Sequence, residues 1–281
     1  MPEASENKDK EPNYESTRVE LEAFLPSVGE QILELRRSAE VDPNFTRLKA
    51  DKSIVTKADV LSEDIIRAWI EDRFPEDSIR GEEREQKKGG TRNWIVDPID
   101  GTYNFNNFGN KFGISVGLVE NNVPKLGVIF YPAECISVSA SEGAGALING
   151  EALETSKGVT QLDKSHLIFT IPETLPSYFD KPHFKKTIEQ QRPLVAVTDN
   201  EDLDWSFTFS FLKFLQNKAD AILHFGATPY DIAGAVAIAK ELGLEISGFD
   251  GRQLDFSKDI IPVVISKNPE LHKVIIDCLN Y

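Results

Sequence analysis

The sequence has few of the residues on which redox and nucleophilic active sites usually depend. It contains two cysteines, Cys135 and Cys278, and four histidines in 281 residues. The cysteines are far apart and match no metal or redox spacing, so we expect reduced, structural thiols. None of the histidines stands in a nucleophile–base pattern, so the sequence gives no support for a covalent mechanism of the serine or cysteine type.

Long apolar runs and positive charge are also scarce. No apolar run reaches the length of a membrane-spanning helix, and the first residues lack a signal-peptide core. Lysine and arginine number 31 against 46 acidic residues, which gives a formal charge of −15. This balance argues against a nucleic-acid partner, and it would repel a phosphorylated small molecule unless bound cations reversed the local sign. We therefore expect a cytoplasmic protein without nucleic-acid or membrane partners, which needs metal if it handles phosphate.

Composition and pattern predict one globular body behind a polar tail. The chain is 40% hydrophobic and 27% charged, which is ordinary for a soluble globular protein. Residues 1–15 are polar and charged and predict a flexible acidic tail. Residues 16–281 are expected to form a single domain, with a metal-binding α+β half at 16–155 and an α/β half at 156–281.

Hydrophobic periodicity predicts the elements of both halves. Apolar residues recur at helical spacing over 16–40, where Pro26 suggests a kink or a break. Thr56 and Asp59 form a T-x-x-D capping box that opens a second helix. The period then changes to two, which predicts antiparallel strands at 112–119, 126–131 and 135–140. The second half alternates between strands at 167–171, 194–198, 221–225, 244–249 and 261–266 and helices at 184–190, 206–217, 229–242 and 269–279.

The stretch Trp94–Phe105 (WIVDPIDGTYNF) carries the chemistry. Its apolar start reads as a buried strand, which then delivers Asp97 and Asp100. Buried carboxylates without a lysine or arginine nearby favour a divalent cation such as Mg²⁺. Gly101 and Thr102 read as a helix start, whose free N–H groups can hold an anion. The alternative is a plain strand-to-loop corner, because Asp-Pro and Asp-Gly are also common in turns.

Other acids lie at predicted element ends, and each has a simpler explanation. Asp59 completes a capping box, and Asp231 does the same after Thr228 and Pro229. Glu82 and Glu83 fall in a charged stretch that could be a solvated loop.

Together these segments resemble the inositol monophosphatase family, whose members are Mg²⁺-dependent, often lithium-sensitive phosphomonoesterases. Residues 97–105 resemble the family's D-P-[IL]-D-G-T-x-N-F signature and match it at every position. Its G-E-E loop resembles 81–83, its V-T-x-x-D element resembles 55–59, and its late [WY]-D-x-A-[AG] signature resembles 230–234. The motifs occur in the family order and cover nearly everything from residue 16 onward. The resemblance implies an αβαβα sandwich with an antiparallel N-terminal sheet and a mixed C-terminal sheet.

The resemblance also implies a set of roles. Two or three Mg²⁺ ions would be held by Glu82, Asp97, the Ile99 carbonyl, Asp100 and Asp231. Glu82 and Thr102 would orient and activate the attacking water, and Asp59 would support an additional ion or the water network. The amides of Gly101 and Thr102 would hold the phosphate, with Asp100 and Asp231 near the substrate. The implied enzyme is a cytoplasmic, homodimeric phosphoric monoester hydrolase.

The substrate end departs from the inositol pattern. His224 stands seven residues before Asp231, where the inositol enzymes have a glutamate that contacts sugar hydroxyls. It is either a substrate contact or a strand-end histidine satisfied by the backbone. Bulky residues at 205–208 replace the small residues that line the inositol pocket. Inositol 1-phosphate leads as the substrate. Histidinol phosphate, a sugar bisphosphate and a nucleotide 3′-phosphate remain alternatives, as does a regulatory protein-binding module on the same fold.

Overall fold

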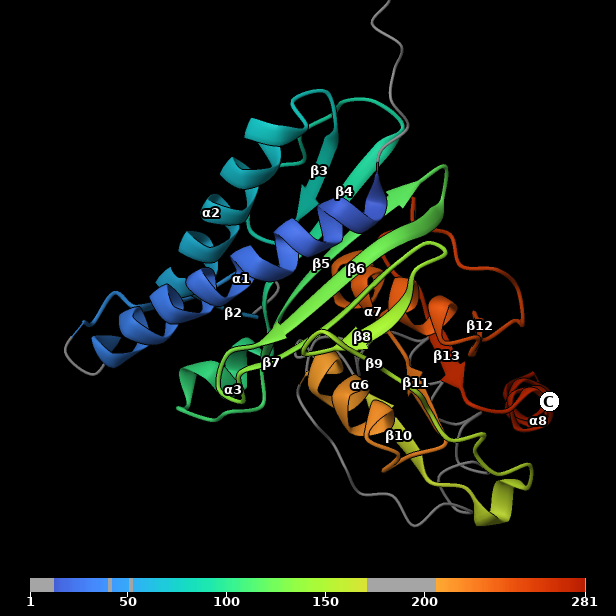
Figure 1. Cartoon of the computed structure of the whole chain (residues 1–281). Coiled ribbons are helices and arrows are strands. Elements are labelled where there is room, and N and C mark those ends of the chain that lie inside the picture. The colour runs from blue at the N-terminus through green and yellow to red at the C-terminus, as the bar shows by residue number, and fades with distance from the viewer. Residues whose placement is uncertain (1–12, 40–41, 51–52, 171–205, 281) are drawn as a thin grey trace, which may run out of the picture.

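The computed structural model describes residues 13–39, 42–50, 53–170 and 206–280 (Figure 1). These residues form alternating layers of helices and sheets. Two helices cover the first sheet, two more lie between the first and second sheets, and one helix covers the outside of the second sheet. This arrangement confirms the predicted αβαβα sandwich.

The first layer consists of α1 (Tyr14–Arg37) and α2 (Lys57–Arg73). α1 begins two residues before the predicted domain start and runs through Pro26, so of the kink or break predicted at this proline the break is wrong. Leu25 and Val28, on either side of this proline, are fully or almost fully buried against the first sheet, and this packing outweighs the one hydrogen bond that proline cannot make. α2 begins at the predicted capping box, in which Thr56 and Asp59 bond reciprocally. A small hairpin, β1 (Thr46–Leu48) and β2 (Ile54–Thr56), precedes α2.

The first sheet has seven strands in chain order. They are β3 (Ser78–Gly81), β4 (Arg92–Asp100), β5 (Gly113–Glu120), β6 (Val123–Tyr131), β7 (Ile136–Ser141), β8 (Gly145–Ile148) and β9 (Glu151–Ala152). β3 runs parallel to β4, and every other neighbouring pair is antiparallel. The three predicted strands are confirmed, and the turn between the first two has positive φ at Asn121 and Asn122, as tight hairpins require. The short strands β8 and β9 were not predicted.

The middle layer consists of α6 (Phe207–Leu215) and α7 (Pro229–Glu241). α7 crosses the first sheet at very close range, because glycines face each other at the contact. A Cβ on Gly127 would lie 2.2 Å from the carbonyl oxygen of Gly234, and one on Gly117 would lie 2.8 Å from the Ala233 backbone. This packing fixes the start of α7 beside the end of β4, where a short helix, α3 (Thr102–Asn106), begins.

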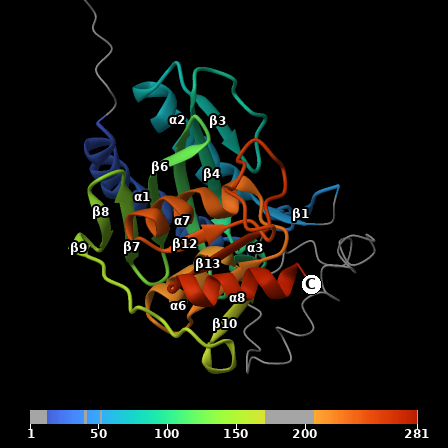
Figure 2. The ribbon, with the colours of Figure 1, turned by 90° about the vertical axis from the view of Figure 1, so that its right-hand side faces the viewer.

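The second sheet is mixed and has the order β10–β11–β13–β12. β10 (Leu167–Thr170) is parallel to β11 (Ala221–His224), whereas β13 (Val263–Ser266) is antiparallel to both β11 and β12 (Glu245–Ser247). A 3₁₀ turn, η2 (Leu162–Lys164), precedes β10. α8 (Pro269–Leu279) covers the outer face of this sheet (Figure 2). The helix expected at 184–190 and the strand expected at 194–198 lie outside the described residues.

Two smaller expectations can be compared with the structure. Cys135 and Cys278 are both free thiols. Among the helices in the described ranges, none has the length and apolar character needed to cross a bilayer.

Candidate active site

A β-bulge at the end of β4 places two carboxylates on the same face of the first sheet. Asp97 pairs with Ser115 and Asp100 with Gly113, so three steps along β4 match two steps along β5. In a regular strand, residues three apart point to opposite faces. The extra residue reverses the alternation, and Pro98, which has no N–H to donate, lies within the irregular stretch.

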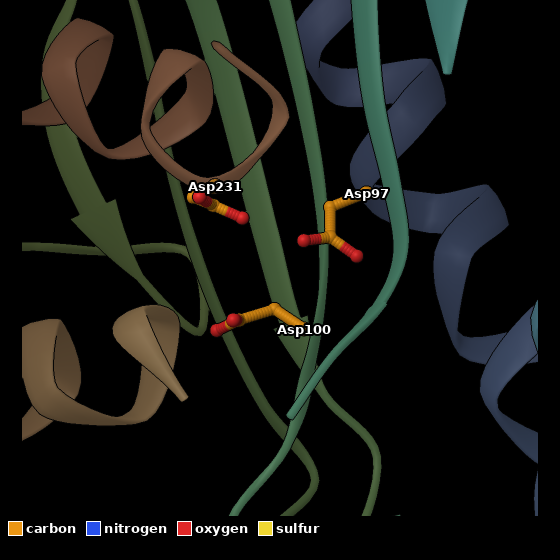
Figure 3. Close-up of side chains that lie close together, drawn as sticks. All are labelled: Asp97, Asp100 and Asp231. Atoms are coloured by element: carbon orange, nitrogen blue, oxygen red, sulfur yellow. The ribbon is translucent and has the colours of Figure 1, made fainter. Parts of the chain in front are cut away.

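Three acids meet where the bulge faces α7. Asp97, Asp100 and Asp231 each offer a carboxylate oxygen within 4.8 Å of the others (Figure 3). Asp97 is 1% exposed and Asp100 is 8% exposed. Burial raises the pKa of Asp97 and that of Asp231 well above the ordinary value, and the neighbouring carboxylates, Glu82 first among them for Asp97, raise the pKa further. Such a group of acids is costly to ionise unless a cation lies between them.

Hydrogen bonds from neighbouring backbone and side-chain groups hold Asp231 and Asp100 in position. Asp231 lies in the first turn of α7, where its Oδ2 accepts the N–H of Thr228 at 2.6 Å. Asp100 accepts three hydrogen bonds from the start of α6, from Ser206 Oγ at 2.8 Å, from the Phe207 N–H at 3.2 Å and from the Thr208 N–H. Burial nevertheless keeps the pKa of Asp100 above its ordinary value. The sequence predicts that residues 205–208 lie near the substrate, but it does not predict the hydrogen bonds that 206–208 donate to Asp100.

Asp59 and Thr102 meet at the carbonyl oxygen of Ile99, within the bulge. Thr102 Oγ1 lies 2.9 Å from both Asp59 Oδ1 and the carbonyl oxygen of Ile99. Burial, opposed by hydrogen bonds from Thr56 and Thr102, raises the pKa of Asp59 to about 6. α3 starts after Gly101, whose φ of +92° belongs to the left-handed region that favours glycine. The structure thus places Thr102 between a buried carboxyl and the carbonyl oxygen of Ile99.

Glu82 and Glu83 lie outside the group of three acids and share a lysine. Lys49 Nζ is 2.7 Å from Glu82 Oε1 and 2.5 Å from Glu83 Oε1. Burial raises the pKa of Glu82 despite Lys49, and burial together with Glu82 raises the pKa of Glu83 to about 7. Sequence reasoning missed Lys49 as part of this site, because a single lysine in a charged stretch gives no local signal of a long-range ion pair.

His224 lies at the end of β11, beside the start of α6. It is 4% exposed, and its ring centroid is 5.4 Å from that of Phe207. Burial lowers its pKa to about 3, so the ring is neutral at physiological pH. Its Nδ1 accepts the N–H of Gly226 at 3.2 Å, which assigns the proton to Nε2. The strand-end position and the backbone hydrogen bond agree with the simpler of the two explanations, and a substrate contact stays a prediction.

The donor set fits a hard divalent cation. Asp97, Asp100 and Asp231 supply carboxylate oxygens, and the Ile99 carbonyl lies in the same bulge. Oxygen ligands of this kind suit Mg²⁺, whereas the described part of the site contains no thiol and one neutral imidazole. The acids come from β4 and α7, which are more than 120 residues apart in the sequence, so the fold creates a cluster that no single segment contains.

Comparison with known proteins identifies the family. A sequence profile described as "Inositol monophosphatase family" matches residues 16–280. A Thermotoga maritima "Fructose-1,6-bisphosphatase/inositol-1-monophosphatase" is 30% identical over 84% of this chain and 86% of its own length. A Chlorobaculum parvum "Histidinol-phosphatase" is 30% identical over 73% of this chain and 76% of its own length.

Solved structures agree with these relatives. A Thermotoga maritima IMPase superposes with a TM-score of 0.76 at 26% identity, over 94% of this chain and 97% of its own. An inositol monophosphatase from Zymomonas mobilis superposes with a TM-score of 0.77 at 26% identity, over 96% of this chain and 100% of its own. The chain therefore belongs to the inositol monophosphatase family.

Proposed function

We propose that this chain hydrolyses a small phosphate monoester with Mg²⁺ bound at Asp97, Asp100 and Asp231. Membership of the family makes the chain a phosphoric monoester hydrolase. The observation that carries the metal assignment is the meeting of three carboxylates within 4.8 Å of one another, the buried one of Asp97 and those of Asp100 and Asp231, next to the start of α3. In the proposal, Glu82 and the Ile99 carbonyl complete a ligand set for two or three ions.

The remaining roles follow from the same geometry. Bound cations would supply a water of lowered pKa and neutralise charge on the phosphoryl oxygens. Thr102 would orient the attacking water together with Glu82, and it would accept the proton of that water while it passes its own hydroxyl proton to the Asp59 carboxylate. The N–H groups of Gly101 and Thr102 would hold the phosphate at the start of α3, next to Asp100 and Asp231.

The leaving group is the open part of this proposal, with two leading candidates. Inositol 1-phosphate is supported by the signature at 97–105 and by relatives such as the Synechocystis "Inositol-1-monophosphatase", 28% identical over 78% of this chain. Histidinol phosphate is supported by the Chlorobaculum relative and by His224 in place of a glutamate. A neutral His224 with its proton on Nε2 would offer one hydrogen bond to a substrate hydroxyl and no charge.

The test is phosphate release from a panel of inositol, histidinol, sugar and nucleotide phosphates, with Mg²⁺ and with chelator. The proposal is supported if the protein hydrolyses at least one monoester and chelator abolishes this activity. Inhibition by Li⁺ would indicate a metal site of the lithium-sensitive type. A chain that releases no phosphate and binds a protein partner stoichiometrically would support the regulatory alternative.

Three further expectations belong to this proposal. We expect residues 16–281 to behave as a single domain, which limited proteolysis tests. We expect a homodimer, which light scattering of the purified protein tests, and a cytoplasmic location.

A further inference from the structure

The loop that carries Glu82 and Glu83 is held from behind by a fully buried carboxylate of α2. Glu63 is 0% exposed. Its Oε2 accepts the N–H of Glu83 at 2.6 Å, and its Oε1 accepts the N–H of Arg84 at 3.1 Å. Two consecutive backbone donors of the loop therefore bind one side chain, as in the anion-binding turns of other proteins.

Arg67, one helical turn after Glu63, bonds both Glu63 and the loop. Its Nε is 2.7 Å from Glu63 Oε1, and its Nη2 donates to the carbonyl oxygen of Glu85 at 2.8 Å. The pair thus holds backbone groups of three consecutive loop residues, 83, 84 and 85. An arginine suits this task because its planar group can bond a carboxylate and a carbonyl at once.

Gly81 shows how closely the loop follows the Glu63 carboxylate. A Cβ at Gly81 would lie 2.1 Å from Glu63 Oε1 and 2.7 Å from Glu63 Oε2. Any side chain at this position would push the carboxylate away from the two N–H groups that it accepts. The glycine that precedes Glu82 and Glu83 therefore matches the carboxylate behind the loop.

The negative charge of Glu63 is unfavourable beside the acids of the site, which argues that its contact with the loop has a function in that site. The charge of Glu63 raises the pKa of Glu82, so Glu63 adds negative charge beside acids that already repel one another. Asp64, the next residue, also contacts the loop, but it pairs with the side chain of Arg84 and is half exposed. Asp64 therefore makes an ordinary surface ion pair, whereas Glu63 fixes the path of the backbone.

We propose that Glu63 and Arg67 are positioning residues that hold the 82–85 loop in the conformation that binds the divalent cation. This inference rests on the proposed function, because it assumes that Glu82 is a ligand. Without the pair, the loop keeps its two glutamates but loses the backbone path that sets where Glu82 stands relative to Asp97, whose pKa it raises. Residues that orient metal ligands typically change metal affinity by about 10- to 100-fold when they are replaced.

The test is Mn²⁺ binding by electron paramagnetic resonance, together with Mg²⁺ titrations of phosphate release. Glu63→Gln and Arg67→Gln should each weaken Mn²⁺ binding by about tenfold or more. Asp64→Asn is the matched control, because it removes a neighbouring charge that contacts the loop side chain and leaves the backbone grip intact. We expect Asp64→Asn to change the Mn²⁺ affinity by less than about twofold.

Arg67→Gln distinguishes positioning from simple charge. It makes the region more negative, so long-range attraction alone would tighten cation binding, whereas loss of positioning weakens it. Mn²⁺ binding by Arg67→Gln that equals or exceeds that of the wild type would overturn the proposal. So would collapse of the fold in both variants, seen as loss of the thermal transition, since the pair would then serve overall stability.

Failure of the proposed function has a different signature. If the wild type bound no Mn²⁺, or if Asp97→Asn bound it as tightly as the wild type, the assigned metal site itself would be wrong. If the wild type binds Mn²⁺ through Asp97 and both loop variants match it, only the positioning role is lost.

Discussion

Replacing Asp97 with asparagine should make the metal-free protein more stable while abolishing its phosphatase activity. Its carboxylate lies within 4.8 Å of those of Asp100 and Asp231. At an effective dielectric constant of 20, two unit charges at that distance repel each other by about 3 kcal/mol. Partial protonation relieves some of this repulsion, so we expect a gain of about 2 kcal/mol near pH 8, or about 4 °C or more in melting temperature.

The same acids predict how the metal-free wild type responds to pH. A carboxyl whose pKa is raised by folding stabilises the fold while it is protonated, and this contribution is lost as the pH rises through the folded pKa. The pKa is about 6 for Asp59 and about 7 for Glu83, and it is well above the ordinary value for Asp97. Stability in chelator should therefore fall from about pH 4 to about pH 8, and it should fall less in Asp97→Asn.

The assay is differential scanning calorimetry in chelator and in Mg²⁺, with phosphate release measured on the same samples. Mg²⁺ should raise the melting temperature of the wild type, because it binds only the folded state, and should raise that of Asp97→Asn less. Asp72→Asn is the control, since the Asp72 side chain is 80% exposed. The reasoning would be refuted if Asp97→Asn were no more stable than the wild type in chelator, or if it retained activity.

Three further predictions concern the edges of the site. Lys49→Met removes the cation that pairs with Glu82 and Glu83, so half-maximal activity should need less Mg²⁺, which a Mg²⁺ titration measures. Gly101→Ala forces a side chain into the left-handed region and to 2.8 Å from the Lys111 carbonyl oxygen; it should cost about 1–3 kcal/mol in urea unfolding. His224→Gln should leave the shape of the pH–rate profile between about pH 5 and 8 unchanged, because the pKa of His224 is about 3, and any effect should appear in KM for the leaving group.

Local rules predicted those parts of the fold whose cause lies within a few residues. The capping box at Thr56 and Asp59 set the start of α2, and the helix predicted at 269–279 is α8 with the same bounds. The turn at Asn121 and Asn122 followed from residue type. The continuity of α1 through Pro26 did not, because it depends on packing against a sheet formed much later in the chain.

The site shows the same division between local and long-range causes. Sequence motifs found Asp97, Asp100 and Asp231, and the structure brings them together. The ion pairs of Lys49 and the donors that Ser206 and its neighbours give to Asp100 join residues more than 30 and 100 positions apart. Such contacts depend on how the layers stack, which periodicity within one segment does not report.

The irregular end of β4 also decides which layer of the fold Asp100 enters. One surplus residue between Asp97 and Asp100 places both acids on the same side of the sheet although three positions separate them, and an even pleat over the same three positions would turn them to opposite sides. In such an even pleat, Asp100 would enter the apolar layer under α1 and α2, and Ile99 would take its place toward α7. The three-residue spacing of these two acids therefore serves a shared site only in combination with the bulge.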